Sequence, residues 1–123
     1  MPTWIRVAES AVPPVGERPV YLVRRQFSIG AVPAIATLRI SAHGVYTAYL
    51  NGRRIGNDEF TPGYTDYNHR TQFQTYQVAD FLEPGSNVLA VELSDGWYRG
   101  AVGIMQHGDQ YGNGVELWAE ITD

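Results

Sequence analysis

The sequence predicts an all-β protein built as a β-sandwich or jelly roll, and three observations support this class. Thirteen glycines and seven prolines divide the 123 residues into short segments. The segments between these breakers are rich in β-branched and aromatic residues, and several alternate apolar with polar positions, as half-buried strands do. The sequence has no long amphipathic helix. Roughly seven or eight short strands joined by tight turns are typical of two packed antiparallel sheets.

The strand patterns are clearest in the first half of the chain. Residues 20–28 alternate, although Arg25 interrupts an apolar face formed by Tyr21, Val23 and Phe27. Residues 35–42 place four apolar side chains on one face: Ala36, Leu38, Ile40 and Ala42. In the segment 45–56, Asn51-Gly52 supplies two residues that tolerate positive φ, which predicts a type I′ hairpin with a short return strand. The strand before that turn carries Tyr46, Ala48 and Leu50 on one face.

The second half alternates polar turns with strands. Residues 57–68 form a turn-rich loop around Pro62-Gly63, and 78–87 has room for one helical turn before Pro84-Gly85. Further alternating runs predict strands over 71–78, 87–94 and 114–121.

Length and charge restrict the function. A chain of this length fits one domain, 1–123, and buries roughly two-thirds of its unfolded surface, enough for a core without disulfides. Thirteen acidic residues against nine basic ones give a net charge of −4, which argues against a nucleic-acid partner. No apolar stretch approaches the roughly 20 residues of a membrane helix, and the N-terminus lacks a signal-peptide pattern. We therefore expect no membrane partner and a soluble protein, with the cytoplasm favoured.

The sequence gives weak support for catalysis by this chain. Its three histidines all lie beside predicted turns, and Ser41 and His43 are the one local pair that would share a face of a strand. No serine lies in a nucleophile-elbow pattern. The acidic residues that a glycosidase would need as a pair also lie in turns, where aspartate is favoured for conformational reasons.

Calcium is the cofactor that the sequence leaves open. Calcium prefers six to eight oxygen ligands, often from Asp, Asn and carbonyl groups in turns. Asp58, Asp66 and Asn68 belong to one such cluster, and a second lies at Asp109 and Asn113. The alternative interpretation is that these residues only form turns.

Residues 95–100, "DGWYRG", are the strongest candidate for a carbohydrate or interdomain contact. Trp97 or Tyr98 could present an aromatic face to a sugar ring, with Asp95 and Arg99 as polar partners. In an extended segment, however, adjacent side chains face opposite ways. We therefore expect Asp95-Gly96 to form a turn, Trp97 to fill the core, and Tyr98 and Arg99 to face outward.

Several ordered motifs resemble the N-terminal β-sandwich domain of bacterial α-L-rhamnosidases of glycoside hydrolase family 78. The most specific are Asn51-Gly52, "PGYTDY" at 62–67, "PGSN" at 84–87 and "DGWYRG" at 95–100, within a likeness that covers nearly the whole chain. The resemblance implies a galactose-binding-like jelly roll. In the family this domain precedes an (α/α)-barrel that carries the catalytic carboxylates, so the resemblance transfers no catalytic residue to this chain.

The resemblance therefore implies a non-catalytic accessory domain, an N-terminal fragment of a larger glycosidase, that packs against or frames the catalytic domain. Some family members have a related domain that binds L-rhamnose through calcium, so the alternative is a carbohydrate-binding module for rhamnosides. The family domain normally continues beyond "EITD" into further strands. Ending there would leave Glu116–Ile121 as an unpaired edge that could mediate a dimer.

Overall fold

The computed structural model describes residues 3–123, which fold almost entirely as β-structure. The elements in chain order are β1 (Ile5–Arg6), β2 (Tyr21–Ile29), β3 (Thr37–His43), β4 (Val45–Leu50), β5 (Arg53–Arg54), β6 (Gln74–Gln77), the 3₁₀ turn η1 (Ala79–Phe81), β7 (Gly85–Ser94), the helical turn α1 (Gly96–Arg99) and β8 (Glu116–Thr122).

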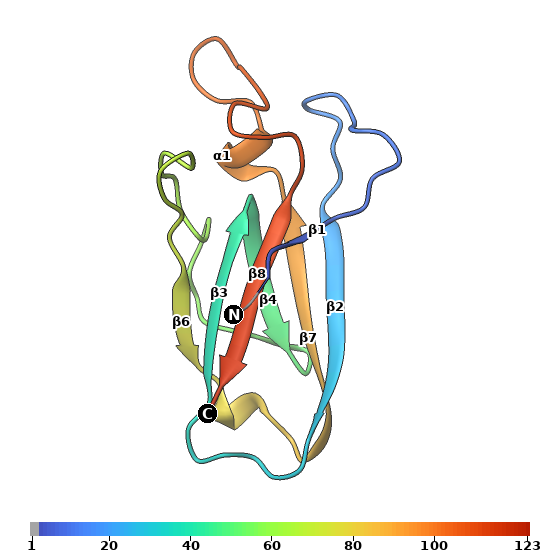
Figure 1. The fold of residues 1–123 in the computed structure, drawn as a ribbon, viewed down its shortest axis with the longest axis vertical. Helices are drawn as coiled ribbons and strands as arrows, with labels where there is room; N and C mark the ends of the chain where they lie inside the picture. The colour runs from blue at the N-terminus through green and yellow to red at the C-terminus, as the bar shows by residue number, and fades with distance from the viewer. Residues whose placement is uncertain (1–2) are drawn as a thin grey trace.

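The strands form two antiparallel four-stranded sheets that pack face to face (Figure 1). One sheet has the order β1-β8-β3-β6, and the other has the order β2-β7-β4-β5. Strands β3 and β4 follow one another in the sequence but lie in different sheets, so the chain crosses the sandwich at Gly44. The predicted fold class, an all-β sandwich, is therefore confirmed.

The predicted apolar faces of β3 and β4 form the centre of the core. The inner side chains of these strands are buried completely or almost completely: Ala36, Leu38, Ile40, Ala42, Tyr46, Ala48 and Leu50. Val91 and Leu93 of β7 complete this centre. The apolar face of β2 is different, because its side chains pack against the core while remaining only partly buried.

The Asn51-Gly52 hairpin forms as predicted. Both residues have positive φ, 52° and 79°, and the two flanking pairs bring β4 and β5 into antiparallel register. The Asn51 side chain also donates to the Oδ1 of Asn87 at 2.8 Å and accepts from the backbone N–H of Val88 at 2.9 Å. Asn87 is fully buried and its amide also bonds the backbone of Glu83 twice, at 2.8 Å each. The motifs at 51–52 and 84–87 therefore meet through one buried group of hydrogen-bonded amide side chains.

Most strand boundaries lie within two residues of the predicted ones, and three differences from the prediction are larger or bear on the function. The strand expected over 71–78 begins only at Gln74, and β7 begins at Gly85 because Pro84-Gly85 turns the chain earlier. The expected helical turn is present as η1. The third difference concerns the edge at Glu116–Ile121. All of β8 pairs with β3, and β1 pairs with its other side at Glu116 and Leu117, so the strand is open on one side only, beyond Leu117.

Loops gather at one end of the sandwich, here called the loop end. It comprises α1 and the connecting segments 7–20, 56–73 and 100–115, which lie together at the top of Figure 1. The motifs at 62–67 and 95–100 lie at the loop end, and the motifs at 51–52 and 84–87 lie together at the opposite end.

Candidate functional site at the loop end

The "DGWYRG" segment folds as a helical turn and not as the extended turn that we predicted. Asp95 is already helical, with φ −54° and ψ −46°, and α1 follows it. Gly96 has φ +52°, and a Cβ at this position would overlap Val45, so this position requires glycine. Side chains in a helical turn do not alternate between two faces as those in a strand do. The predicted orientation was wrong for this reason: Trp97 is partly exposed, whereas Tyr98 and Arg99 are buried.

Arg99 is the centre of a buried ion-pair network. Its side chain is 0% exposed, and its guanidinium donates to Glu9 through both terminal nitrogens, at 2.8 and 3.1 Å. The Nε donates to the carboxylate of Asp95, and Nη1 also donates to the carbonyl of Asn113 at 2.8 Å. Tyr21 donates its hydroxyl to Glu9 as well. Arg99 therefore links β7, the segment after β1 and the loop before β8.

A second arginine, Arg18, extends the network on the same side. Its guanidinium makes two hydrogen bonds to Asp109, at 2.8 and 3.1 Å, and lies 3.4 Å from Asp95. It also donates to the carbonyls of Arg99, at 2.9 Å, and Pro13, at 2.8 Å. Only 3% of the Arg18 side chain is exposed. The long 7–20 segment is thus fixed against the 100–115 loop by charge-assisted hydrogen bonds.

The network shifts the titration of its members in the direction expected for paired charges. The hydrogen bond from Arg99 holds the pKa of the Glu9 carboxyl below its ordinary value, in spite of burial. The hydrogen bonds to Asp109 raise the pKa of Arg18. The guanidinium of Arg99 thus has all three of its nitrogens bonded to Glu9, Asp95 and the carbonyl of Asn113. Asp95 and Arg99 are not available as the polar partners of a sugar.

Aromatic rings form a continuous cluster beside this network. The rings of Trp4, His43 and Tyr98 stack in three layers, with centroids 4.0 and 4.5 Å apart. Tyr98 also meets the edge of Tyr67 at 5.3 Å and lies 6.2 Å from Tyr111. Burial raises the pKa of the Tyr98 hydroxyl. Tyr98 thus supplies the core contact that we assigned to Trp97.

Trp97 instead belongs to an exposed group, here called the aromatic edge, made of Phe60, Tyr64 and Trp97. Its ring lies 5.8 Å from that of Phe60 and 6.0 Å from that of Tyr64. Phe60 and Tyr64 are both well exposed. The most exposed apolar side chains of the loop end are Ile104, at 99%, and Met105, at 76%. The loop end therefore exposes large apolar side chains, and the ion pairs of Arg18 and Arg99 hold its loops together.

The predicted metal ligands are engaged with separate partners. Asp58 accepts a hydrogen bond from the hydroxyl of Tyr76 at 2.6 Å, and burial together with this bond raises the pKa of Tyr76 to about 12. Asp66 lies 2.7 Å from the Nδ1 of His69 and accepts from the backbone N–H of Asn68 at 3.2 Å. Between residues 3 and 123, no three His, Cys, Asp or Glu side chains group as metal ligands would.

The Ser41–His43 pair is not arranged as a nucleophile and base. Ser41 is buried and donates its hydroxyl to the carbonyl of Gln72. His43 is held in the aromatic stack, with Nδ1 3.4 Å from Glu116.

No helix in the described part of the chain has the length and apolar character needed to cross a membrane.

Sequence reasoning missed Glu9 and Arg18, the two residues that complete the network. They lie in a segment, 7–20, with neither strand nor helix periodicity, and their partners are about 80 to 90 positions away in the sequence. Charged residues in a proline-rich segment are usually solvated, so no local signal distinguishes these two from the others.

The fold and the loop end together define a β-sandwich module whose charged and aromatic residues brace its own loops. Comparison with known proteins gives the family. The α-L-rhamnosidase N-terminal domain family matches residues 31–122. An α-L-rhamnosidase of Streptomyces avermitilis is 48% identical over 86 residues, covering 70% of this chain and 8% of the relative, and one of Formosa agariphila is 40% identical over 89 residues, covering 72% and 10%. The chain therefore belongs to the α-L-rhamnosidase N-terminal domain family.

Solved structures agree with the sequence comparison. The native α-L-rhamnosidase of Aspergillus terreus superposes with a TM-score of 0.79 at 30% identity, covering 87% of this chain and 13% of that one. The S. avermitilis enzyme in complex with L-rhamnose superposes with a TM-score of 0.78 at 42% identity, covering 81% and 10%. The chain thus spans about a tenth of the length of the relatives that it matches.

Proposed function

We propose that the chain is a non-catalytic accessory domain of an α-L-rhamnosidase-like glycoside hydrolase and packs against its catalytic domain. The observation that carries this proposal is the coverage: most of this chain aligns with about a tenth of each relative. The loop end adds a physical reason. Exposed apolar side chains are typical of a protein–protein contact where they lie on one surface, and Phe60, Ile104 and Met105 are all exposed on segments of the loop end.

The test compares the intact enzyme with the isolated chain. The variant Ile104→Ser/Met105→Ser should lower the melting temperature of the intact enzyme and leave that of the isolated chain unchanged, because these side chains contact nothing within the sandwich. Ile35→Ser is the matched control, since Ile35 is 66% exposed in the connection between β2 and β3, which lies at the opposite end of the sandwich (Figure 1). If both variants leave the intact enzyme unchanged, the loop end is not the contact.

A carbohydrate-binding module for L-rhamnose or rhamnosides is the second candidate function. The partly exposed Trp97, flanked by Phe60 and Tyr64, favours it because aromatic faces pack against the apolar faces of sugar rings. The S. avermitilis relative was solved with L-rhamnose, which supports the same class of ligand. Since Asp95 and Arg99 are occupied, the polar contacts would come from other loop-end groups. Asp58 and Asp66 bond Tyr76 and His69 separately, so the residues predicted for calcium do not fit a shared ion and this candidate assigns none to them.

Titration with L-rhamnose tests this second function. A bound sugar on Trp97 should change tryptophan fluorescence, and Trp97→Phe should remove the change while Trp4 and Trp118 still report on folding. Titrations with and without calcium should give the same response, because the residues predicted for calcium do not group around one ion. A flat response at millimolar sugar, with and without calcium, would exclude the module.

A further inference from the structure

The chain contains two asparagine–glycine pairs, Asn51-Gly52 and Asn113-Gly114, at opposite ends of the sandwich. An asparagine followed by glycine is especially prone to deamidation, because glycine has no side chain to shield its backbone nitrogen from the neighbouring amide. The reaction requires Cγ of the asparagine to approach that nitrogen, so the fold decides which pair can react.

The side chain of Asn51 is held by three hydrogen bonds. Its Nδ2 donates to the carbonyl of Phe81 and to Oδ1 of Asn87, both at 2.8 Å, and its Oδ1 accepts from the N–H of Val88 at 2.9 Å. The backbone N–H of Asn51 also donates to the carbonyl of Val88 at 2.9 Å. The side-chain bonds would have to break before Cγ could approach the nitrogen of Gly52, so the fold protects this pair.

Asn113 is exposed and is far less restrained. Its Oδ1 accepts one side-chain hydrogen bond, from Nη2 of Arg6 at 2.8 Å, and its Nδ2 donates to no group within residues 3–123. The N–H of Gly114 also donates to no backbone carbonyl in this part of the chain. A single bond to an exposed arginine is therefore all that holds the side chain, and the amide nitrogen that would depart is unbonded.

Arg6 places a positive charge beside both residues of this pair. Its guanidinium donates to Oδ1 of Asn113 and also covers the buried Gly114, where an added Cβ would overlap it. When the pair reacts, the nitrogen of Gly114 loses its proton and Oδ1 of Asn113 gains negative charge. A cation at this position stabilises the charge as it develops.

We propose that Asn113-Gly114 is a site of spontaneous deamidation in the folded chain and that Arg6 promotes the reaction. The deprotonated nitrogen of Gly114 attacks Cγ of Asn113, and an N–Cγ bond forms. The Cγ–Nδ2 bond then breaks, and the departing amine takes up a proton and leaves as ammonia. Water opens the resulting succinimide at either of its carbonyls, which gives aspartate or isoaspartate. The inference does not depend on the proposed function.

The two products act differently on the loop end. Aspartate leaves the main chain unchanged and turns the hydrogen bond from Arg6 into an ion pair. Isoaspartate carries the main chain through Cγ, which adds a methylene, and converts the original carbonyl of residue 113 into a carboxylate. That carbonyl accepts from Nη1 of Arg99 at 2.8 Å, so isoaspartate disturbs the buried network. We therefore expect the deamidated chain to melt at a lower temperature than the Asn113→Asp variant.

Peptide mass mapping of the chain after incubation in mildly alkaline buffer tests the proposal. In the folded chain, Asn113 should deamidate at least about tenfold faster than Asn51, which is the matched internal control. In denaturant the two rates should be comparable, because the hydrogen bonds that protect Asn51 are lost.

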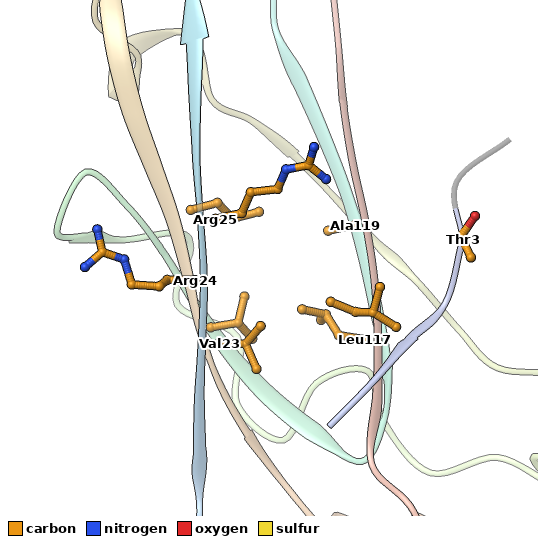
Figure 2. Close-up of a pocket in the computed structure, with 9 residues that line it drawn as sticks. Thr3, Val23, Arg24, Arg25, Leu117 and Ala119 are labelled. Carbon is orange, nitrogen blue, oxygen red and sulfur yellow. The ribbon is translucent and has the colours of Figure 1, made fainter. Parts of the chain in front are cut away.

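Substitution of the arginine tests its part in the reaction. Arg6→Gln should slow deamidation at Asn113 about fivefold, a modest effect because the charge is exposed to water, and Arg6→Lys should restore most of the rate because lysine keeps the charge. Arg24→Gln is the matched control and should leave the rate unchanged. Arg24 is an exposed arginine of β2 whose guanidinium points away from β8 (Figure 2).

Equal rates at Asn51 and Asn113 in the folded chain, or no product at Asn113, would overturn the proposal. The same preference for Asn113 in denaturant would also overturn it, because the neighbouring residues and not the fold would then set the rates. Unchanged or faster deamidation in Arg6→Gln would contradict the role of Arg6.

Discussion

Replacing Arg99 with methionine should destabilise the domain severely. The substitution keeps most of the apolar stem, but it removes the donors that bind Glu9, Asp95 and the carbonyl of Asn113. Glu9 has a side chain that is largely buried, so it would be left as a buried carboxylate without its cation. Removing one partner of a buried pair typically costs about 3–5 kcal/mol.

For a domain of this size, 1 kcal/mol lowers the melting temperature by about 4 °C, so the expected loss is roughly 12–20 °C. Urea unfolding followed by tryptophan fluorescence measures the free energy directly. Arg39→Met is the matched control, because Arg39 is exposed and lies 3.7 Å from an exposed partner, Glu120. An exposed pair of this kind contributes about 0–1 kcal/mol.

The pH dependence of this loss tests its cause. In the native protein the pKa of Glu9 is lowered, so its pairing stabilises the fold above the ordinary carboxyl pKa, and this contribution disappears as the pH falls through the lowered value. Without Arg99, burial would raise the pKa of Glu9, so protonation would stabilise the variant. The difference in unfolding free energy between the two proteins should therefore begin to shrink above the ordinary carboxyl pKa, as Glu9 of the variant is protonated, and should continue to shrink until Glu9 of the native protein is protonated below it. A difference below 1 kcal/mol at pH 7, or one that is independent of pH, would refute the ion-pair explanation.

Three further pairs of substitutions test the packing of the motifs. Tyr98→Ala should cost about 3 kcal/mol of unfolding free energy and Trp97→Ala about 1 kcal/mol, since only Tyr98 is buried; the reverse order would restore the orientation predicted from the sequence. Asn87→Ala should lower the unfolding free energy by about 2–3 kcal/mol, because it leaves the backbone groups of Glu83 without partners. Ser86→Ala, on the exposed side of the same turn, should change it by less than about 0.5 kcal/mol. Equal effects would show that the buried hydrogen bonds of Asn87 do not stabilise the fold. Gly96→Ala should lower the unfolding free energy in urea more than Gly103→Ala does. Both glycines have positive φ, but only at Gly96 would the added Cβ overlap a neighbour, Val45. Equal decreases in unfolding free energy would mean that Val45 can move aside.

Much of the sheet structure could be predicted because period-2 alternation reports burial on one face directly. The buried faces of β3 and β4 and the Asn51-Gly52 turn follow from residues next to one another in the sequence. The partner strands do not follow in this way, since β8 pairs with β3 across more than 70 positions.

The candidate site was harder to predict because its chemistry depends on the local backbone and on distant partners. The helical turn at Gly96–Arg99 exchanges the expected positions of Trp97 and Tyr98. Arginine is usually solvated, so the complete burial of Arg99 could be recognised only after Glu9 was known to face it. The quoted motifs identified residues that matter to the structure: Asp95 and Arg99 fix the loops, and Asn51 and Asn87 fix the turns at the other end of the sheets.

The central claim is that this domain packs against a catalytic domain without contributing to the chemistry. Cutting the chain of the folded enzyme between the two domains tests it most directly. A protease site inserted after the domain in the intact enzyme would allow the connection to be cut once the protein has folded. Sedimentation velocity of the cut enzyme, with its hydrolysis of an aryl α-L-rhamnoside measured in parallel, gives the result. We expect the two pieces to sediment together and kcat to stay within about twofold of the uncut value. Separation of the pieces, or release of the aryl group by the domain on its own, would contradict the account.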